Sequence, residues 1–243
     1  MRIIKLNATD STNSYLRNLS VKEKLDDYTV VLAEKQINGR GQMGTIWESE
    51  TARNLTFSVF KDFFGHAVEQ PFVISMVTAL AILKTLQGFS VPRLSIKWPN
   101  DILSEHKKIC GVLIENVIKQ NTLQASIIGI GLNVNQTSFE NLPQASSLKI
   151  ITGQIHNPEE IAISILEHLK GYFKLLAKGE FNEVKEAYES CLFRKNKPST
   201  FKDPEGLMFS GFIKGVSDSG NLQVLLEDNI LKEFNLKEIT LLY

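Results

Sequence analysis

A glycine-rich segment between two strand-like runs sets the first limit on the fold. Gly39, Gly41 and Gly44 match the spacing G-x-G-x-x-G of a dinucleotide-binding loop. That loop needs a helix directly after it, so that the helix N-terminus meets a pyrophosphate. Here the loop follows the apolar run 29–33, and the run 54–60 behind it is rich in β-branched and aromatic residues, which predicts a strand. A Rossmann site is therefore excluded, and we predict a loop between strands that closes over a ligand.

The composition places the chain among globular proteins with one sizeable core and room for a small extra module. Of its 243 residues, 43% are hydrophobic and 22% are charged. Lys plus Arg and Asp plus Glu both number 27, so no overall cationic field favours nucleic acid. No apolar run reaches the length of a membrane span, and the N-terminus turns polar too early for a signal peptide. We expect a cytoplasmic protein with no membrane or nucleic-acid partner. Its two cysteines form no C-x-x-C motif that would suggest zinc or redox chemistry.

Strand and helix patterns alternate through the first 190 residues and predict an α+β domain over 1–194. The predicted strands are 3–6, 29–33, 54–60, 94–98, 109–118 and 122–130, and the predicted helices are 12–19, 71–88, 158–176 and 181–193. After residue 195 the runs become short, with turn residues about every ten positions: 209–213, 222–226 and 231–234. This spacing predicts a small C-terminal β-barrel over 195–243.

Three polar segments interrupt apolar surroundings. K-W-P-N-D at 97–101 closes a strand, where ligands often gather, although Pro-Asn-Asp also favours a plain turn. K-K-I-C-G at 107–111 leads one of two lysines towards a buried strand; the other must face away. Gly111 stands where a side chain would block a close-packed ligand. Asn133 and Asn135 follow an apolar run, where they either contact a ring or ribose or cap the strand.

Together these segments resemble the biotin protein ligases. The resemblance rests on D-S-T-N at 10–13, Gln36 with G-R-G-Q-M-G-T-I-W at 39–47, K-W-P-N-D, K-K-I-C-G-V-L-I-E and G-I-G-L-N-V-N, in this order. It implies a class II synthetase-like domain, with a mixed sheet flanked by helices, and a small SH3-like barrel. Such enzymes join biotin to ATP, release pyrophosphate, and pass the biotinyl group to one lysine of a carboxyl carrier domain, which releases AMP.

The resemblance also implies roles for individual residues. Ser11, Thr12, Asn13 and Gln36 would bind biotin, and the loop residues Gly39, Arg40, Gly41 and Gln42 would order over biotin and phosphate. Lys108, rather than Lys107, would contact the biotin carboxylate and the adenylate. Trp47 would pack on the closed loop or the adenine side. Lys97, Asn100 and Asn133 would border the nucleotide, with Gly111 and Asn135 also at the ligand, and Asp101 would lie near the acceptor lysine or a metal. Arg40, Lys97, Lys108 and Asp101 form the expected catalytic set, with Mg²⁺ accompanying ATP, no dedicated metal ligands and no tightly bound prosthetic group.

The sequence departs from the family pattern in one respect and leaves alternatives. Many relatives carry several arginines in the loop, whereas this chain has Arg40 alone, with Gln42, Met43 and Thr45 at the other places. The motifs begin by residue 10, so we expect a short form without a DNA-binding domain and without repressor function. The alternatives are a lipoate–protein ligase and a non-catalytic biotin or adenylate sensor. Relatives include monomers and dimers, so a homodimer is possible.

Overall fold

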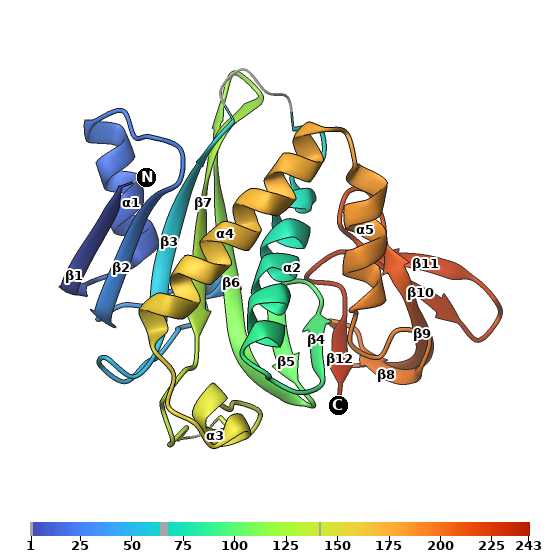
Figure 1. Ribbon diagram of the computed structural model, residues 1–243. Helices are drawn as coiled ribbons and strands as arrows, with labels where there is room; N and C mark the ends of the chain where they lie inside the picture. The colour runs from blue at the N-terminus through green and yellow to red at the C-terminus, as the bar shows by residue number, and fades with distance from the viewer. Residues whose placement is uncertain (1, 64–67, 141) are drawn as a thin grey trace.

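A seven-stranded mixed sheet forms the centre of the molecule in a computed structural model that describes residues 2–63, 68–140 and 142–243 (Figure 1). The strand order is β1-β2-β3-β7-β6-β5-β4. β1 and β2 pair in parallel and every other neighbouring pair is antiparallel. The strands are β1 (Ile3–Thr9), β2 (Thr29–Gln36), β3 (Leu55–Asp62), β4 (Leu94–Lys97), β5 (Asp101–Ser104), β6 (Lys107–Lys119) and β7 (Thr122–Leu132).

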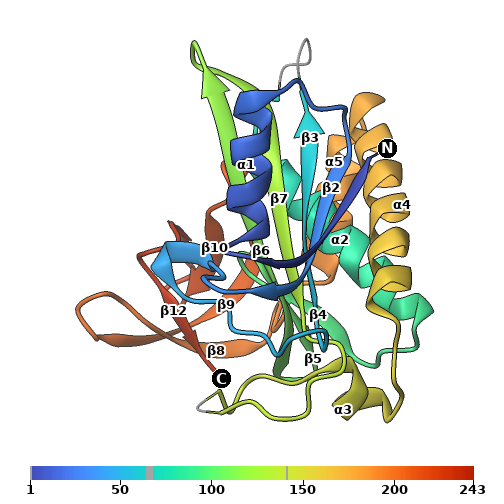
Figure 2. The same cartoon turned by 90° about the vertical axis from the view of Figure 1, so that its left-hand side faces the viewer.

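Helices cover the two faces of this sheet unequally. α2 (Phe72–Gly88), α4 (Pro158–Ala177) and α5 (Phe181–Ser190) lie on one side, and α1 (Thr12–Lys22) lies on the other (Figures 1 and 2). A short helix, α3 (Leu148–Thr152), follows the sheet. α2 is buried over almost its whole length, as expected of a central helix that is apolar all round.

Alternation along β7 divides the core and opens the site. Ile128, Ile130 and Leu132 belong to the main core with α2 and α4, whereas Ile127 packs in a smaller cluster with α1. Successive strand residues face opposite sides, so Gly129 and Gly131 face the α1 side. A Cβ on Gly129 would overlap the Asn13 side chain. The α1 side of the sheet therefore carries space and polar groups where the other side carries close packing.

A five-stranded antiparallel sheet forms the C-terminal part, in the order β11-β10-β9-β8-β12. Its strands are β8 (Pro198–Lys202), β9 (Met208–Val216), β10 (Leu222–Leu226), β11 (Leu231–Phe234) and β12 (Thr240–Leu242). Residues 191–197 connect it to α5, and the predicted boundary at 194/195 falls within this connection. Phe201 and Val224 join the main hydrophobic core, so the two parts pack together. The division into two domains stays a prediction.

The predicted α+β class is confirmed, and the differences concern short strands. β5 lies between the predicted strands 94–98 and 109–118, where the sequence analysis predicts no strand, although its Ile102 and Leu103 are fully buried. β8 and β12 were also missed, because strands of three to five residues contain too few positions to show an alternating pattern. In each case pairing with a neighbouring strand defines the element.

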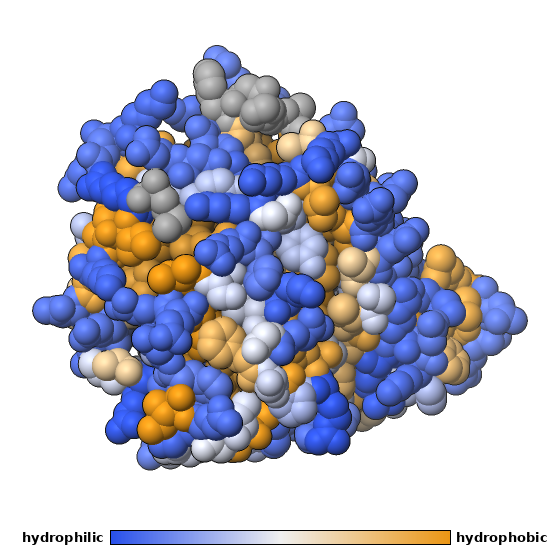
Figure 3. Space-filling view, in the orientation of Figure 1, coloured by the Kyte–Doolittle hydropathy of each residue, from blue (hydrophilic) through white to orange (hydrophobic). Residues whose placement is uncertain are grey.

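The outer surface on the side of α4 is mainly hydrophilic, with scattered apolar spots (Figure 3). Scattered exposed apolar residues are normal for globular proteins. Within the described ranges, every helix is too short or too polar to cross a membrane.

Candidate active site

A cavity of about 620 Å³ lies between the start of α1, the glycine loop, the turn between β4 and β5, the middle of β6 and β7, and the C-terminal sheet. It brings together thirteen of the expected site residues, which are Ser11, Thr12, Asn13, Gln36, Arg40, Gly41, Gln42, Trp47, Lys97, Asn100, Asp101, Lys108 and Gly111. Segments spread over the first half of the chain thus meet in one place.

Fixed amides line one end of the cavity. Gln36 Oε1 accepts hydrogen bonds from the backbone N–H and the hydroxyl of Thr12 at 2.8 and 3.1 Å. The Thr12 N–H belongs to the first turn of α1, where no carbonyl of the helix itself can accept it. Because both bonds use the Gln36 oxygen, its amide nitrogen carries the hydrogens available to a ligand.

Asn13 is held in the opposite sense. Its Nδ2 donates to Glu115 Oε2 at 2.8 Å and to Leu113 O at 3.3 Å. Its Oδ1 accepts from Ser58 Oγ at 2.6 Å and keeps a second lone pair. The side chain is 2% exposed, so this end of the cavity presents a fixed donor from Gln36 and a fixed acceptor from Asn13.

The glycine loop is a tight hairpin. Trp47 N donates to Gly39 O at 2.9 Å and Gly41 N donates to Thr45 O at 2.7 Å, with a bridge between Arg40 and Ile46. A Cβ on Gly39 would overlap the Trp47 carbonyl, and one on Gly41 would overlap the Thr45 side chain. These two glycines therefore allow the arms to approach, and the loop is followed by a strand, as predicted.

The turn of this hairpin has both central residues in the left-handed region. Met43 has φ 55° and ψ 31°, Gly44 has φ 80°, and Thr45 N bonds Gln42 O at 3.1 Å. This is a type I′ turn, which glycine and asparagine favour and methionine does not. Met43 and Ile46 are exposed on the hairpin beside the open cavity.

Trp47 lies on a platform of two paired glycines. Gly111 and Gly131 are direct partners across β6 and β7. A Cβ on Gly131 would overlap the indole ring, and one on Gly111 would lie 3.1 Å from it. Trp47 Nε1 is buried without a hydrogen-bond partner among the described residues. The two glycines therefore leave room for the indole to pack directly against the sheet, beside the cavity that Trp47 lines.

Two lysines and one aspartate form the other end of the cavity. Lys108 Nζ lies 2.6 Å from Asp101 Oδ1, and Lys97 Nζ lies 3.7 Å from Asp101 Oδ2. The lysine side chains are 35% and 25% exposed, and that of Asp101 is 13% exposed. Lys97 also lies over the ring of Tyr243, at 5.3 Å. Two cations share one carboxylate, which leaves this end with net positive charge.

The two adjacent lysines of β6 point in different directions. Lys107 faces outwards and donates to Pro143 O, whereas Lys108 turns into the cavity. Asn100 donates to Val112 O at 2.7 Å, which fixes its amide beside the lysines. Burial raises the pKa of the adjacent Cys110 thiol far above its usual value, so this thiol stays protonated and supplies no nucleophile.

Three expected residues are not among those lining the cavity: Gly39, Asn133 and Asn135. Asn133 donates to Ser146 O at 3.0 Å. Asn135 donates to His156 O at 2.8 Å and accepts from His156 N at 3.0 Å. β7 ends at Leu132, so both amides hydrogen-bond backbone groups of the segments that follow the strand. This arrangement matches the capping role that the sequence left open as an alternative.

Several residues that our site prediction omitted take part in the geometry. Ser58 and Glu115 hydrogen-bond Asn13 at the end of the cavity formed by Thr12, Asn13 and Gln36, which we call the amide end. Gly129 leaves room for Asn13, and Gly131 leaves room for Trp47. The C-terminal part adds apolar walls near the lysines, from Leu222, Leu236, Ile239 and Leu241. The quoted motifs contain Glu115 and both glycines, but their periodicity does not show which side chain they meet.

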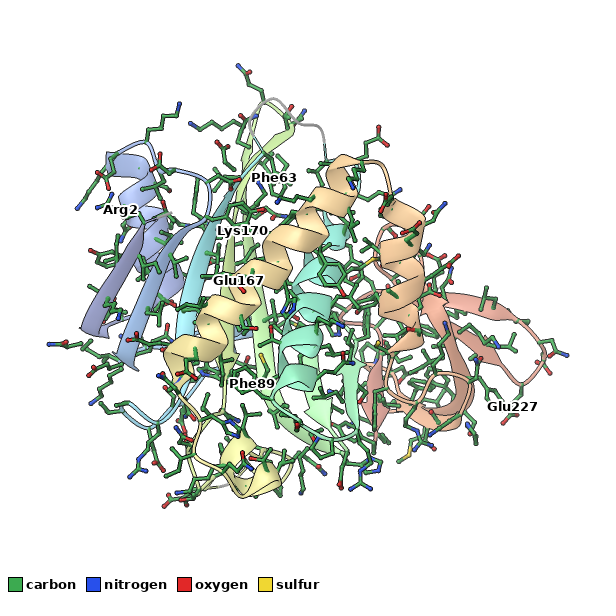
Figure 4. The ribbon with its side chains drawn as sticks, in the orientation of Figure 1. Arg2, Phe63, Phe89, Glu167, Lys170 and Glu227 are labelled. Atoms are coloured by element: carbon green, nitrogen blue, oxygen red, sulfur yellow. The ribbon has the colours of Figure 1, made fainter. Side chains whose placement is uncertain are left out.

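A second cavity, of about 900 Å³, lies on the α4 side of the sheet. Aromatic rings and lysines line it, among them Phe63, directly after β3, and Lys170, in the second half of α4 (Figure 4). Phe63 and Val68 flank residues outside the described ranges, and we assign no site there. Within those ranges, no group of three or more His, Cys, Asp or Glu side chains is placed to hold a metal ion.

Comparison with known proteins identifies relatives over almost the whole chain. The bifunctional ligase/repressor BirA of Bacillus subtilis is 28% identical over 231 residues, covering 92% of this chain and 68% of that protein. The biotin–[acetyl-CoA-carboxylase] ligase of Paracoccus denitrificans is 27% identical over 221 residues, covering 88% of this chain and 90% of the relative. The structure of the biotin protein ligase from Aquifex aeolicus in complex with biotin and ATP superposes with a TM-score of 0.83 at 27% identity, over 99% of this chain and 98% of the other.

The family assignment rests on a match to more than half of the chain. The sequence model of the biotin/lipoate A/B protein ligase family matches residues 6–133, a span that contains the hairpin, both lysines and the amide end. The relatives and the superposed structure named above are biotin ligases. The chain therefore belongs to the biotin/lipoate A/B protein ligase family.

Proposed function

We propose that this protein is a biotin–protein ligase. It activates biotin with ATP to form biotinyl-5′-AMP and pyrophosphate, and then transfers the biotinyl group to a lysine of a biotin carboxyl carrier domain, with release of AMP. The observation that carries the proposal is a single cavity with fixed amides at one end and two lysines at the other. The catalytic unit is residues 1–194, with 195–243 as the small domain, and a cytoplasmic location stays a prediction.

The amide end fits the ureido ring of biotin. That ring has one carbonyl acceptor and two N–H donors. Gln36 offers an amide nitrogen as donor, and Asn13 offers a lone pair on Oδ1 as acceptor. Ser11, the N-cap residue of α1, makes no side-chain capping bond, and its hydroxyl lies in the cavity wall. Buried, pre-oriented polar groups of this kind discriminate strongly against a ligand that cannot pair with them.

The lysine end fits the phosphate chemistry. The biotin carboxylate oxygen attacks the α-phosphorus, and the bond to the oxygen of the departing pyrophosphate breaks. Two anions approach each other in this step, so fixed cations lower its barrier. Lys97 and Lys108 stand at the cavity, and Arg40 comes from the hairpin. Asn100 would border the nucleotide, and Trp47 would pack beside it.

The residues present fit a magnesium ion that arrives with ATP. Mg²⁺ is usually held by one or two carboxylates together with substrate phosphates. Asp101 is the acidic side chain among the residues that line the cavity, and it would supply that carboxylate. When bound, the ion offsets phosphate charge.

The second step depends on positioning of the acceptor amine and on exclusion of water more than on charge. The acceptor lysine nitrogen attacks the acyl carbon, the bond from that carbon to the AMP oxygen breaks, and the amine loses a proton. Asp101 would orient the incoming amine or accept its proton. The Gly39–Trp47 hairpin, with Arg40, Gly41 and Gln42, would close over the adenylate and keep water out.

The names of the relatives support biotin as the acid and a carboxylase as the partner. The matched family also includes lipoate ligases. The test is incubation with MgATP, an equimolar mixture of biotin and lipoate, and a carrier domain, followed by intact mass. We expect a gain of one biotinyl group; a lipoyl gain, or no gain with no pyrophosphate released, would overturn the proposal. A sensor would bind biotin without releasing pyrophosphate.

A further inference from the structure

Glu115 is a carboxylate at the edge of the cavity to which neither proposed step gives a role. It lies on β6 on the same side as Gly111 and Leu113, which line the cavity. Its side chain is 18% exposed. Oε2 lies 2.8 Å from both Asn13 Nδ2 and Arg40 Nη2, and Oε1 lies 3.9 Å from Arg17 Nη2.

These contacts join three separate elements at one carboxylate. Asn13 belongs to α1, Arg40 to the glycine hairpin, and Glu115 to the sheet. A carboxylate accepts only, so the Asn13 amide must turn its nitrogen towards β6. Leu113 O, beside it, is also an acceptor. Both hydrogens of Asn13 Nδ2 are thereby directed at the protein, and Oδ1 is left to the ligand side.

Without Glu115, the Asn13 side chain would lose the shorter of the two hydrogen bonds that hold its nitrogen towards β6. An amide flip exchanges nitrogen and oxygen within almost the same volume. The Leu113 bond is long, at 3.3 Å, and Ser58 can either donate or accept through its hydroxyl. A flipped Asn13 would present N–H groups to the N–H groups of a ureido ring, which is an unfavourable pairing.

Glu115 also determines where Arg40 rests. The Arg40 side chain is 45% exposed and forms an ion pair with Glu115. This contact seats the hairpin against the amide end, away from Lys97 and Lys108, which pair with Asp101. The same carboxylate therefore links the hairpin to the residue that we expect to accept from the ligand.

We infer that Glu115 is a positioning residue for the ligand: it fixes Asn13 as a hydrogen-bond acceptor towards the ureido ring and ties the Arg40 hairpin to that end of the cavity. The inference rests on the proposed function, because the ligand is biotin. It assigns Glu115 no contact with the reacting atoms. A merely structural carboxylate would support folding without selecting one orientation of Asn13.

The experiment is a double-mutant cycle on biotin affinity, measured by calorimetry on the full chain without ATP. Glu115→Ala should weaken biotin binding about tenfold, the scale of a charged hydrogen bond. In an Asn13→Ala background the same change should have no more than about a twofold effect, because the acceptor that Glu115 orients towards the ureido ring is gone, and the tie to Arg40 adds little to biotin affinity without ATP. Glu23→Gln, which removes the partner carboxylate of Arg2 at the far end of α1, is the control and should bind as the wild type.

Each other outcome is decisive. Wild-type affinity in Glu115→Ala, or an equal loss in both backgrounds, would overturn the inference while leaving the proposed function in place. If Glu115→Ala does not fold, Glu115→Leu, which keeps side-chain volume without an acceptor, is read by the same criteria. A wild-type protein that does not bind biotin would overturn the proposed function, and the inference with it.

Discussion

The two ends of the cavity are built in different ways. At the amide end, Thr12 and Asn13 are almost fully buried, and hydrogen bonds of 2.6–3.3 Å join them to Gln36, Ser58, Leu113 and Glu115. At the lysine end the side chains are a quarter to a third exposed, and they pair with Asp101. Its apolar walls come from the C-terminal part. The amide end is already held by hydrogen bonds, whereas the lysine end holds an ion pair that, under the proposed function, phosphate would have to replace.

This difference gives a physical order of events. Under the proposed function, biotin would bind to the amide end without rearrangement, so little ordering cost would oppose it. The phosphates of ATP would compete with Asp101 for the two lysines, and Asp101 would also be the carboxylate that holds magnesium. We therefore expect charge changes to act on rate, and amide changes to act on biotin affinity.

The largest effect should come from Lys108→Ala. Removal of one pre-positioned cation at the attacked phosphate should lower the rate of biotinyl-AMP formation about a hundredfold or more, with little loss of stability at this part-exposed site. Pyrophosphate release under saturating biotin and ATP measures it. Lys107→Ala is the matched control, since Lys107 faces outwards to Pro143 O. A normal rate for Lys108→Ala would remove the lysine end from the chemistry.

Gln36→Leu should act on affinity at the other end. It deletes the proposed donor to the ureido carbonyl and orphans the buried Thr12 N–H. We expect a loss of biotin affinity of about tenfold or more and a fall of about 1–3 kcal/mol in the free energy of unfolding. Calorimetry and urea denaturation measure the two quantities. Gln223→Leu, on the C-terminal sheet beside Glu233, should leave affinity unchanged. If Gln36→Leu weakened only ATP binding, the assignment of the amide end to biotin and of the lysine end to phosphate would be wrong.

Gly131→Ala tests the platform between the two ends. The added methyl group would overlap the Trp47 indole, so the ring or the strand must shift, at a cost of about 1–3 kcal/mol in the free energy of unfolding. Tryptophan emission should change as the ring moves. Gly171→Ala on α4 meets nothing within 4 Å and should stabilise the helix slightly. Unchanged emission in Gly131→Ala would show that Trp47 does not rest on the glycine pair in solution.

The smallest effect should come from Trp98→Phe. Trp98 Nε1 donates to Gly220 O at 2.9 Å, which joins the turn after β4 to the C-terminal part. Loss of this bond should cost about 1 kcal/mol in the free energy of unfolding and raise the KM for ATP more than that for biotin. Equal changes in the two constants would mean that the C-terminal part serves both ends alike.

The sequence predicts the long elements and most of the site, since these depend on local patterns. The amphipathic stripe of α4 and the apolar runs of β6 and β7 show their periodicity directly. β5 shows no such periodicity, because it is short and its side chains become buried through pairing with β6. Short elements of this kind become visible only with their neighbours.

Side-chain partners limit the site prediction in the same way. Alternation along the strand shows that one of Lys107 and Lys108 faces away, and the choice of Lys108 comes from the family resemblance. Asn133 and Asn135 look equally suitable, but the strand ends before them and backbone groups of the following loop take their amides. Ser58 and Glu115 reach Asn13 through the packing of α1 on the sheet, a contact between distant residues that no local pattern contains.

The most direct measurement is pyrophosphate release by the wild-type protein with MgATP, with and without biotin and in the absence of any carrier. If the two ends of the cavity act on one bound biotin and one bound ATP, release requires biotin, and biotinyl-5′-AMP is recovered from the protein by mass spectrometry. Pyrophosphate release that is independent of biotin, or tight biotin binding with no release, would contradict this division of the cavity.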